Sequence, residues 1–166
     1  MIDKFDSFMK DLFESYENPV NINWIDKSNE LIGLFQVDEN IYQIYCKQHD
    51  NLIWTYKFMK YDKISKTFSL ELNTTSPKSK MTILGTIRNG MDYLISHKNP
   101  NGIVFSALDK SSGRKKLYTR FSEEIVERYK YDFKTSLQGD KQVFILHKNI
   151  KIELIIDLIG KIIFDL

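Results

Sequence analysis

The stretch from Leu31 to Met59, LIGLFQVDENIYQIYCKQHDNLIWTYKFM, gives the clearest indication of the fold. Apolar and polar side chains alternate along it, and two short polar clusters, residues 38–40 and 49–51, interrupt the alternation. A period of two is typical of strands with one buried face, and short polar interruptions are typical of hairpin turns. The stretch therefore predicts consecutive antiparallel strands over residues 31–37, 41–47 and 52–59.

The predicted meander extends on both sides of this stretch. Residues 21–25 and 67–72 have the composition and alternation of strands, which gives four or five strands joined by short turns. Before them, Phe5, Phe8 and Leu12 recur at helical spacing and Pro19 follows, which predicts a helix over residues 3–16. Residues 1–72 are thus expected to form one helix and an antiparallel meander.

The second half of the chain has a different pattern. A helix is predicted over residues 81–97, although the pair Asn89-Gly90 favours a turn. The apolar period continues through this pair, and a glycine inside a helix costs only about 1 kcal/mol. A nearly continuous apolar strand over 103–108, a helix over 114–129 and a hairpin of 132–137 with 142–147 complete the segment 81–147.

The apolar C-terminal segment, residues 150–166, leaves two alternatives open, a helix or two short strands about Gly160 and Lys161. If its apolar face is uncovered, we expect a protein partner or self-association through these residues. The chain shows no repeat and no low-complexity linker. Residues 1–166 are therefore predicted to form a single α+β domain, an antiparallel or mixed sheet flanked by helices.

Composition excludes several classes of protein. The 166 residues are 42% apolar and 28% charged, which excludes disorder for most of the chain. A net charge of +2 is too small to indicate nucleic acid or an anionic membrane. The single Cys46 excludes an internal disulfide. No secretory leader and no membrane-length apolar stretch is visible, so we expect a cytoplasmic protein.

Most chemical motifs are also excluded. His49, His97 and His147 are far apart and have no paired spacing, so no metal site is predicted. Residues 107–115 lack the first glycine of a phosphate-binding loop, and the basic residues at 114, 115, 116 and 120 are typical of a solvated helix face. No nucleophile elbow is present, and Cys46 is expected to pack as a small apolar group.

One group of residues is suited to binding phosphate and transferring a proton. Lys78, Ser79 and Lys80 precede the helix predicted from residue 81, and the N–H groups at a helix N-terminus attract phosphate. The next strand leads to a helix that bears Tyr118, whose phenol is suited to protonating a leaving group. These residues define the candidate site.

Four blocks resemble a family of uncharacterised phage-encoded proteins: Met81-Thr-Ile-Leu-Gly-Thr-Ile87, His97-Lys-Asn-Pro100, Ile103-Val-Phe-Ser-Ala107 and Arg114-Lys-Lys-Leu-Tyr118. The similarity spans about Leu34 to Tyr131 and implies no assigned activity. More distantly, the order meander, helix, strand, helix is similar to that of the GCN5-related acetyltransferases. This resemblance implies an acetyltransferase-like (GNAT-like) topology.

The acetyltransferase resemblance implies a role for each candidate residue. Tyr118 would be the general acid, Glu71 on the preceding strand would be the base, and the pyrophosphate of acetyl-coenzyme A would be held by Lys78, Ser79, Lys80 and Thr82. The chain has no glycine-rich pattern at that loop. We therefore expect a non-enzymatic phage or mobile-element protein, a binding or virion-associated module of the host cytoplasm or virion. The alternative is an N-acyltransferase that uses acetyl-coenzyme A.

Overall fold

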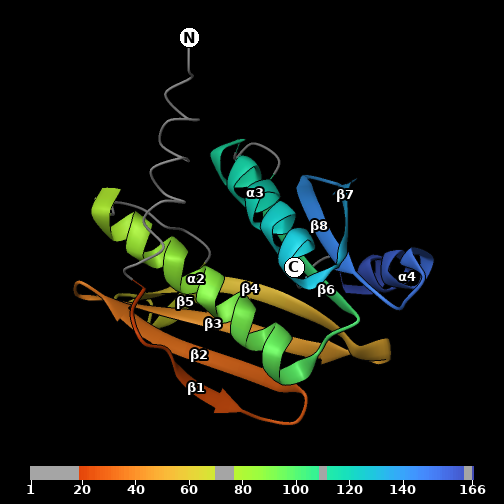
Figure 1. Ribbon diagram of the computed structural model, residues 1–166. Helices are drawn as coiled ribbons and strands as arrows, with labels where there is room; N and C mark the ends of the chain where they lie inside the picture. Colours follow the sequence, from red (N-terminus) through yellow and green to blue (C-terminus); the bar gives the residue numbers. More distant parts are fainter. Residues whose placement is uncertain (1–18, 70–76, 109–111, 163–165) are drawn as a thin grey trace. The chain divides into compact units, whose positions relative to one another are not determined.

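The computed structural model describes residues 19–69, 77–108, 112–162 and 166 (Figure 1). Its first half contains strands β1 (Asn23–Asp26), β2 (Glu30–Val37), β3 (Asn40–His49), β4 (Ile53–Asp62) and β5 (Thr67–Ser69), with a 3-10 turn, η1 (Asp50–Leu52), between β3 and β4. Its second half contains helix α2 (Pro77–Lys98), strand β6 (Gly102–Leu108), helix α3 (Ser112–Tyr129), strands β7 (Asp132–Gln138) and β8 (Lys141–His147), and helix α4 (Ile152–Ile162).

The eight strands form one mixed sheet. Seven of them follow the order β1-β2-β3-β4-β6-β8-β7, and β5 pairs with β4 beside this path. β4 and β6 are parallel, with residues 53–55 opposite residues 102–104, whereas the pairs β1/β2, β4/β5, β6/β8 and β7/β8 are antiparallel. A parallel pair needs a crossover connection, and α2 supplies it. The predicted α+β class with a mixed, mostly antiparallel sheet is confirmed.

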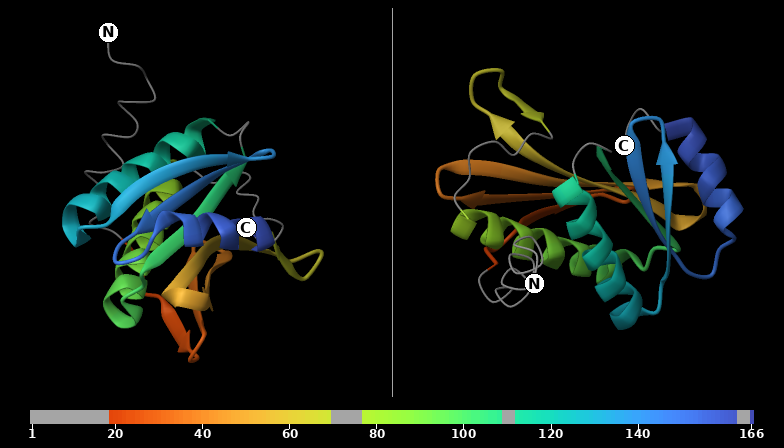
Figure 2. Two further views of the ribbon diagram at one scale, coloured as in Figure 1. Left: turned by 90° about the vertical axis from the view of Figure 1, so that its right-hand side faces the viewer. Right: turned by 90° about the horizontal axis from the view of Figure 1, so that it is seen from above.

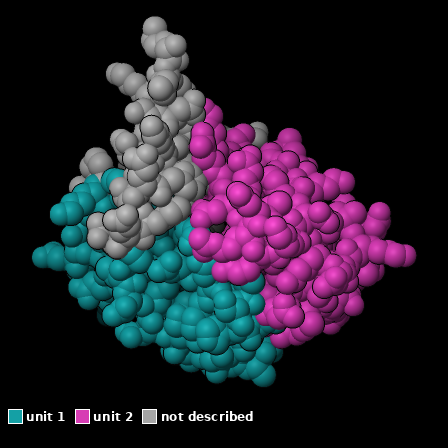
Figure 3. All heavy atoms as spheres, viewed as in Figure 1, with its two compact units in different colours: residues 1–46, 58–98 teal, residues 47–57, 99–166 magenta. Residues whose placement is uncertain are grey.

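Contacts divide the chain into two compact units (Figure 3). Unit 1 comprises residues 1–46 and 58–98, and unit 2 comprises residues 47–57 and 99–166. Strands β3 and β4 therefore contribute residues to both units. Each unit has its own pattern of burial.

Unit 1 is a meander with one buried face, which α2 covers (Figure 1). Alternate residues of β2 and β3 are buried, among them Phe35 and Tyr42, and the residues between them are half-buried or exposed. This pattern is typical of an antiparallel sheet with one solvated face. The apolar face predicted for the helix is found on α2, where the buried residues include Ile83, Ile87, Met91, Leu94 and Ile95.

Unit 2 is a sheet with both faces covered. α3 contacts the face that bears Phe105 and Phe144, because Tyr118 meets both rings. Successive residues of a strand point to opposite faces, and α4 packs against Val104 and Val143 on the other face. β8 accordingly lies between α3 and α4 (Figure 2). Coverage on both sides explains why residues 143–146 are all buried.

Most boundaries agree with the sequence predictions to within a few residues, but α2 begins at Pro77 instead of residue 81. Residues 78–80 therefore lie in the first turn of the helix and not, as was predicted, in a loop before it. The chain continues as a helix through Asn89-Gly90, and residues 152–162 are a helix rather than two strands. The first strand begins at Asn23 instead of residue 21. Just before it, the Val20 N–H donates to Thr86 Oγ1 of α2 at 3.0 Å. The helix predicted over 3–16 and the end of the strand predicted over 67–72 lie outside the described residues.

Candidate functional site

The start of α2 holds most of the residues predicted to bind pyrophosphate. Lys78 is exposed, and the Thr82 hydroxyl donates to the Lys78 carbonyl oxygen at 3.3 Å within the helix. The Lys80 side chain lies outside the described residues. Ser79 is the buried member of the group, with 6% of its surface exposed. The environment of Ser79 therefore decides what this helix end can bind.

The partner of Ser79 is a carboxylate. The Ser79 hydroxyl donates to Asp38 Oδ2, and Asp38 lies in the turn between β2 and β3 with a positive φ of 54°. A negative side chain near a helix N-terminus is stabilised by the helix dipole. The same negative charge repels a phosphate at that place. Asp38 thus supplies the anion that this end of α2 attracts.

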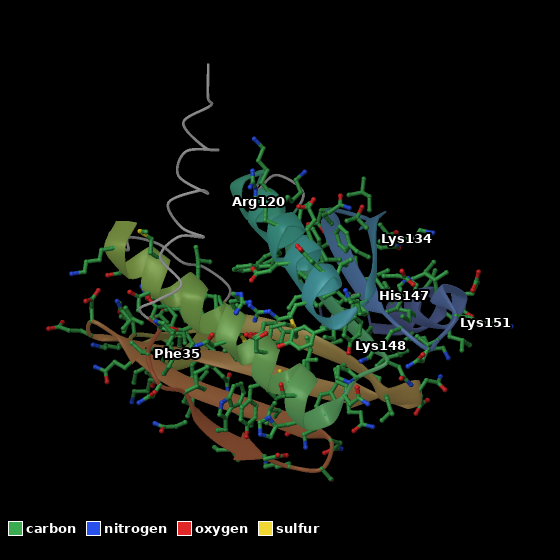
Figure 4. All side chains as sticks on the ribbon, viewed as in Figure 1. Phe35, Arg120, Lys134, His147, Lys148 and Lys151 are labelled. Carbon is green, nitrogen blue, oxygen red and sulfur yellow. The ribbon has the colours of Figure 1, made fainter. Side chains whose placement is uncertain are left out.

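Tyr42 adds a second polar group near Asp38. Its ring stacks with Phe35 and Phe58 at centroid distances of 5.4 and 5.5 Å, and Phe35 lies between the sheet and α2 (Figure 4). The Tyr42 hydroxyl is buried and has no hydrogen-bond partner among the residues that the structure describes. Burial, and then the charge of Asp38, raise the pKa of Tyr42.

The predicted general acid belongs to unit 2. Tyr118 lies on α3 and meets Phe105 and Phe144 edge-on, at centroid distances of 5.3 and 5.6 Å. Its ring is thus held in an aromatic cluster with the sheet of unit 2. Glu71, the predicted base, lies outside the described residues. The described chain therefore places Ser79 and Asp38 together in unit 1 and Tyr118 in unit 2.

The other reactive groups are in inert surroundings. Cys46 is fully buried, and burial raises the pKa of its thiol, so little thiolate forms near neutral pH. His49 Nε2 lies 3.3 Å from Thr55 Oγ1. No group of three or more His, Cys, Asp or Glu among the described residues is placed to hold a metal ion. Arg120 of the basic cluster is exposed on α3 (Figure 4).

Unit 1 also contains an open hollow of about 320 Å³ between the segment entering β1 and the C-terminal half of α2. Its apolar lining includes Val20 and Ile22. Polar groups come from both sides, from the chain before β1 and from successive turns of the helix. The polar side chains of the lining are those of Asn21, Asn89, Asp92, Ser96 and His97.

Three stacked rings border this hollow. Tyr93 is the middle ring, with its centroid 4.3 Å from that of Trp24 and 3.7 Å from that of His97. Trp24 is held against Gly33 of β2, where a Cβ atom would come within 2.7 Å of the indole. Trp24 is thus packed between Tyr93 and the backbone of β2.

Sequence patterns did not reveal the two groups that the structure brings together here. Asp38 and Ser79 are 41 residues apart, and the hollow joins residues 20–24 to residues 89–97. The only sequence signal for the second group was the spacing of Tyr93 and His97, which lie one helical turn apart.

Comparisons of the chain with protein-family models, with curated proteins and with solved structures find no match. Within the part of the chain that the structure describes, no helix is both long enough and apolar enough to span a bilayer. The start of α2, the Tyr118 cluster and the hollow are therefore the features on which a functional assignment depends.

Proposed function

We propose that the chain is a non-enzymatic binding module with an acetyltransferase-like fold, encoded by a phage or mobile element. The order of elements supports the fold assignment, since a meander (β1–β5) is followed by a helix (α2), a strand (β6) and a second helix (α3). The parallel pairing of β4 with β6 across α2 is the connection that this order requires.

The hydrogen bond from Ser79 to Asp38 carries the non-enzymatic part of the proposal. An acyl-coenzyme A enzyme of this layout would use the start of α2 for a pyrophosphate. Here the buried hydroxyl is engaged by a carboxylate, which repels the ligand and satisfies the helix dipole in its place. Lys78 remains at this helix end, but its side chain is exposed.

The alternative function is N-acyl transfer from acetyl-coenzyme A. The placement of Tyr118 favours it, because the aromatic cluster fixes this phenol on the helix that follows β6. In that case Tyr118 would protonate the departing thiolate. Replacement of Tyr118 by Phe would then abolish turnover and leave acetyl-coenzyme A binding intact.

The thermal midpoint of the chain with acetyl-coenzyme A separates the two functions. A ligand at about 100 times its dissociation constant adds roughly 2.7 kcal/mol, which is about 5–10 °C for a chain of this size. We expect no shift at millimolar acetyl-coenzyme A, with adenosine bisphosphate as the control ligand. A shift of several degrees that the Lys78→Ala variant loses, together with acetyl transfer that the Tyr118→Phe variant loses, would overturn the non-enzymatic proposal.

The proposal includes a protein partner or a second copy bound through residues 150–166. On α4, Leu154 and Ile156 support it, because 45% and 39% of their surfaces are exposed. Sedimentation velocity of the wild type and of Leu154→Lys tests it. A wild type that sediments as a monomer at all concentrations, as the variant does, would remove self-association.

A further inference from the structure

We propose that the hollow beside β1 and α2 binds a neutral sugar ring, a hexose or N-acetylhexosamine unit of a glycan. This proposal rests on the proposed function, because a binding module must have a ligand. It adds the chemical class of the ligand and the site in unit 1 where the ligand binds.

The charge of the hollow favours a neutral ligand. Asp92 is the formally charged member of the lining at neutral pH, and its Oδ2 lies 2.8 Å from Nη1 of Arg88. The Arg88 side chain is 8% exposed, so the pair is set into unit 1 as a neutral unit. Among the described residues of the lining, a phosphate would meet a carboxylate and no lysine, and an organic cation would meet an acid that is already neutralised.

The hydrogen-bonding groups favour a ligand rich in hydroxyls. Asn21 and Asn89 each offer a donor and an acceptor, and the Ser96 hydroxyl offers both. Sugar hydroxyls are likewise both donors and acceptors, and two neighbouring hydroxyls can form hydrogen bonds with one amide group. A purely apolar ligand would desolvate these amides without replacing their hydrogen bonds to water.

The shape of the hollow favours one ring with C–H faces. Its volume of about 320 Å³ is at the lower end of small-molecule sites, which span roughly 300–1,000 Å³. Tyr93 is stacked on Trp24 and on His97, so a planar base finds no open phenol face to stack on. Sugar C–H groups can instead contact Val20, Ile22 and the ring edges.

The test uses the two tryptophans of the chain as reporters in ¹⁵N NMR spectra. Trp24 borders the hollow, whereas Trp54 is buried in unit 2. Glucose, galactose, mannose and N-acetylglucosamine are titrated separately into the full chain. We expect at least one of them to move the Trp24 indole resonance saturably, with a dissociation constant on the order of 1 mM for so open a site, while Trp54 stays unchanged.

Two variants make the assignment specific. Asn89→Ala removes an exposed lining amide from α2, where alanine favours the helix, and should weaken binding about tenfold. Asn23→Ala is the matched control, since Asn23 is exposed nearby on β1 but is not part of the lining, and it should bind as the wild type does.

Three results would overturn the sugar proposal: no movement of the Trp24 resonance with any of the four sugars, equal affinity in Asn89→Ala, or a stronger response to inorganic phosphate than to a sugar. The thermal experiment with acetyl-coenzyme A is independent of these titrations. If neither ligand binds, only the sugar proposal fails. If acetyl-coenzyme A binds and its acetyl group is transferred, the proposed function fails whatever the sugars do.

Discussion

Two buried tyrosines differ in what their hydroxyls contact. Tyr131 donates to the Pro100 carbonyl oxygen at 2.5 Å, and Lys148 Nζ lies 4.6 Å from the centre of its ring. Tyr42 is at least as buried, yet its hydroxyl has no partner among the described residues. A buried polar group without a partner loses its hydrogen bonds to water and regains nothing on folding.

The Tyr→Phe variants at these two positions should therefore have opposite effects. We expect Tyr42→Phe to leave the free energy of unfolding unchanged or to raise it by up to about 1 kcal/mol, and Tyr131→Phe to lower it by about 1–2 kcal/mol. Urea unfolding followed by far-UV circular dichroism measures both. If Tyr42→Phe proves as destabilising as Tyr131→Phe, the Tyr42 hydroxyl has a hydrogen-bond partner in solution.

A third tyrosine, Tyr45, should make the stability of the protein depend on pH in the alkaline range. Burial, together with the hydrogen bond from the Tyr45 hydroxyl to Glu30 at 2.8 Å, raises the pKa of Tyr45 from 10.0 to about 12. The unfolded chain then loses this proton at lower pH than the folded chain does. The stabilisation that Tyr45 provides is thus complete below about pH 10 and is lost as the pH rises to about 12.

We expect the urea midpoint to fall across this pH range and to fall less steeply in Tyr45→Phe. Titration of phenolate absorbance in the folded protein should show a group that ionises well above pH 10. A Tyr45→Phe variant whose midpoint follows the wild type through the same range would show that Tyr45 is not responsible.

At the scale of elements, two glycines test how strands and helices are packed. Gly160 lies on the exposed side of α4 with nothing within 4 Å of the place where a Cβ atom would be. Gly33 lies in β2, where a Cβ atom would come within 2.7 Å of both Ile22 and Trp24. A side chain can be added at Gly160 without a clash, whereas at Gly33 the space for a Cβ atom is occupied by Trp24 of the neighbouring strand.

Alanine at the two positions should shift stability in opposite directions. We expect Gly160→Ala to raise the free energy of unfolding by about 1 kcal/mol, through helix propensity and lower entropy of the unfolded chain. Gly33→Ala should lower it by about 1–3 kcal/mol, because the ring or the strand must move. Thermal unfolding of both variants measures this, and a Gly33→Ala protein as stable as the wild type would mean that Trp24 does not occupy this place.

The helices and strands also show which structural features can be predicted from sequence patterns. The period of two in residues 31–47 and the helical period of residues 83–95 both follow from which face is buried, so the elements were predictable to within a few residues. The start of β1 was predicted two residues too early. The chain just before this strand is bonded to α2 by a contact that sequence patterns do not show, from the Val20 N–H to Thr86, 66 residues away. The continuous apolar runs of β6 and β8 predicted burial without showing that α4 supplies the second cover.

The candidate site was less predictable than the elements, because it depends on contacts between residues that are far apart in the sequence. Ser79 was found because a helix start is a local feature of sequence. Its partner Asp38 is set by the fold, and that partner reverses the electrostatic argument for a pyrophosphate. Residues 20–24 and 89–97 form a hollow only after the strands of unit 1 have paired and α2 has covered them.

At the scale of the whole molecule, α4 and Leu166 of the apolar C-terminal segment belong to the core of unit 2. The Lys141 ammonium donates to the Leu166 carbonyl oxygen at 2.7 Å, and Leu166 is 5% exposed. The cluster that α4 completes on the sheet includes Ile53, Val104, Val143, Ile145, Ile155 and Ile159. Deleting the chain after His147 would expose one face of β6 and β8, so we expect the truncated protein to aggregate or unfold.

Single substitutions on α4 separate its buried side from the side available to a partner. Ile159 is 1% exposed and lies in the cluster, so Ile159→Ala should cost about 2–5 kcal/mol of unfolding free energy. Ile156 is 39% exposed, and Ile156→Ala should change stability by less than about 0.5 kcal/mol. Urea unfolding of both variants compares residues of one type on one helix. Equal and small effects would mean that α4 does not cover the sheet in solution, and that the whole apolar segment is available for binding.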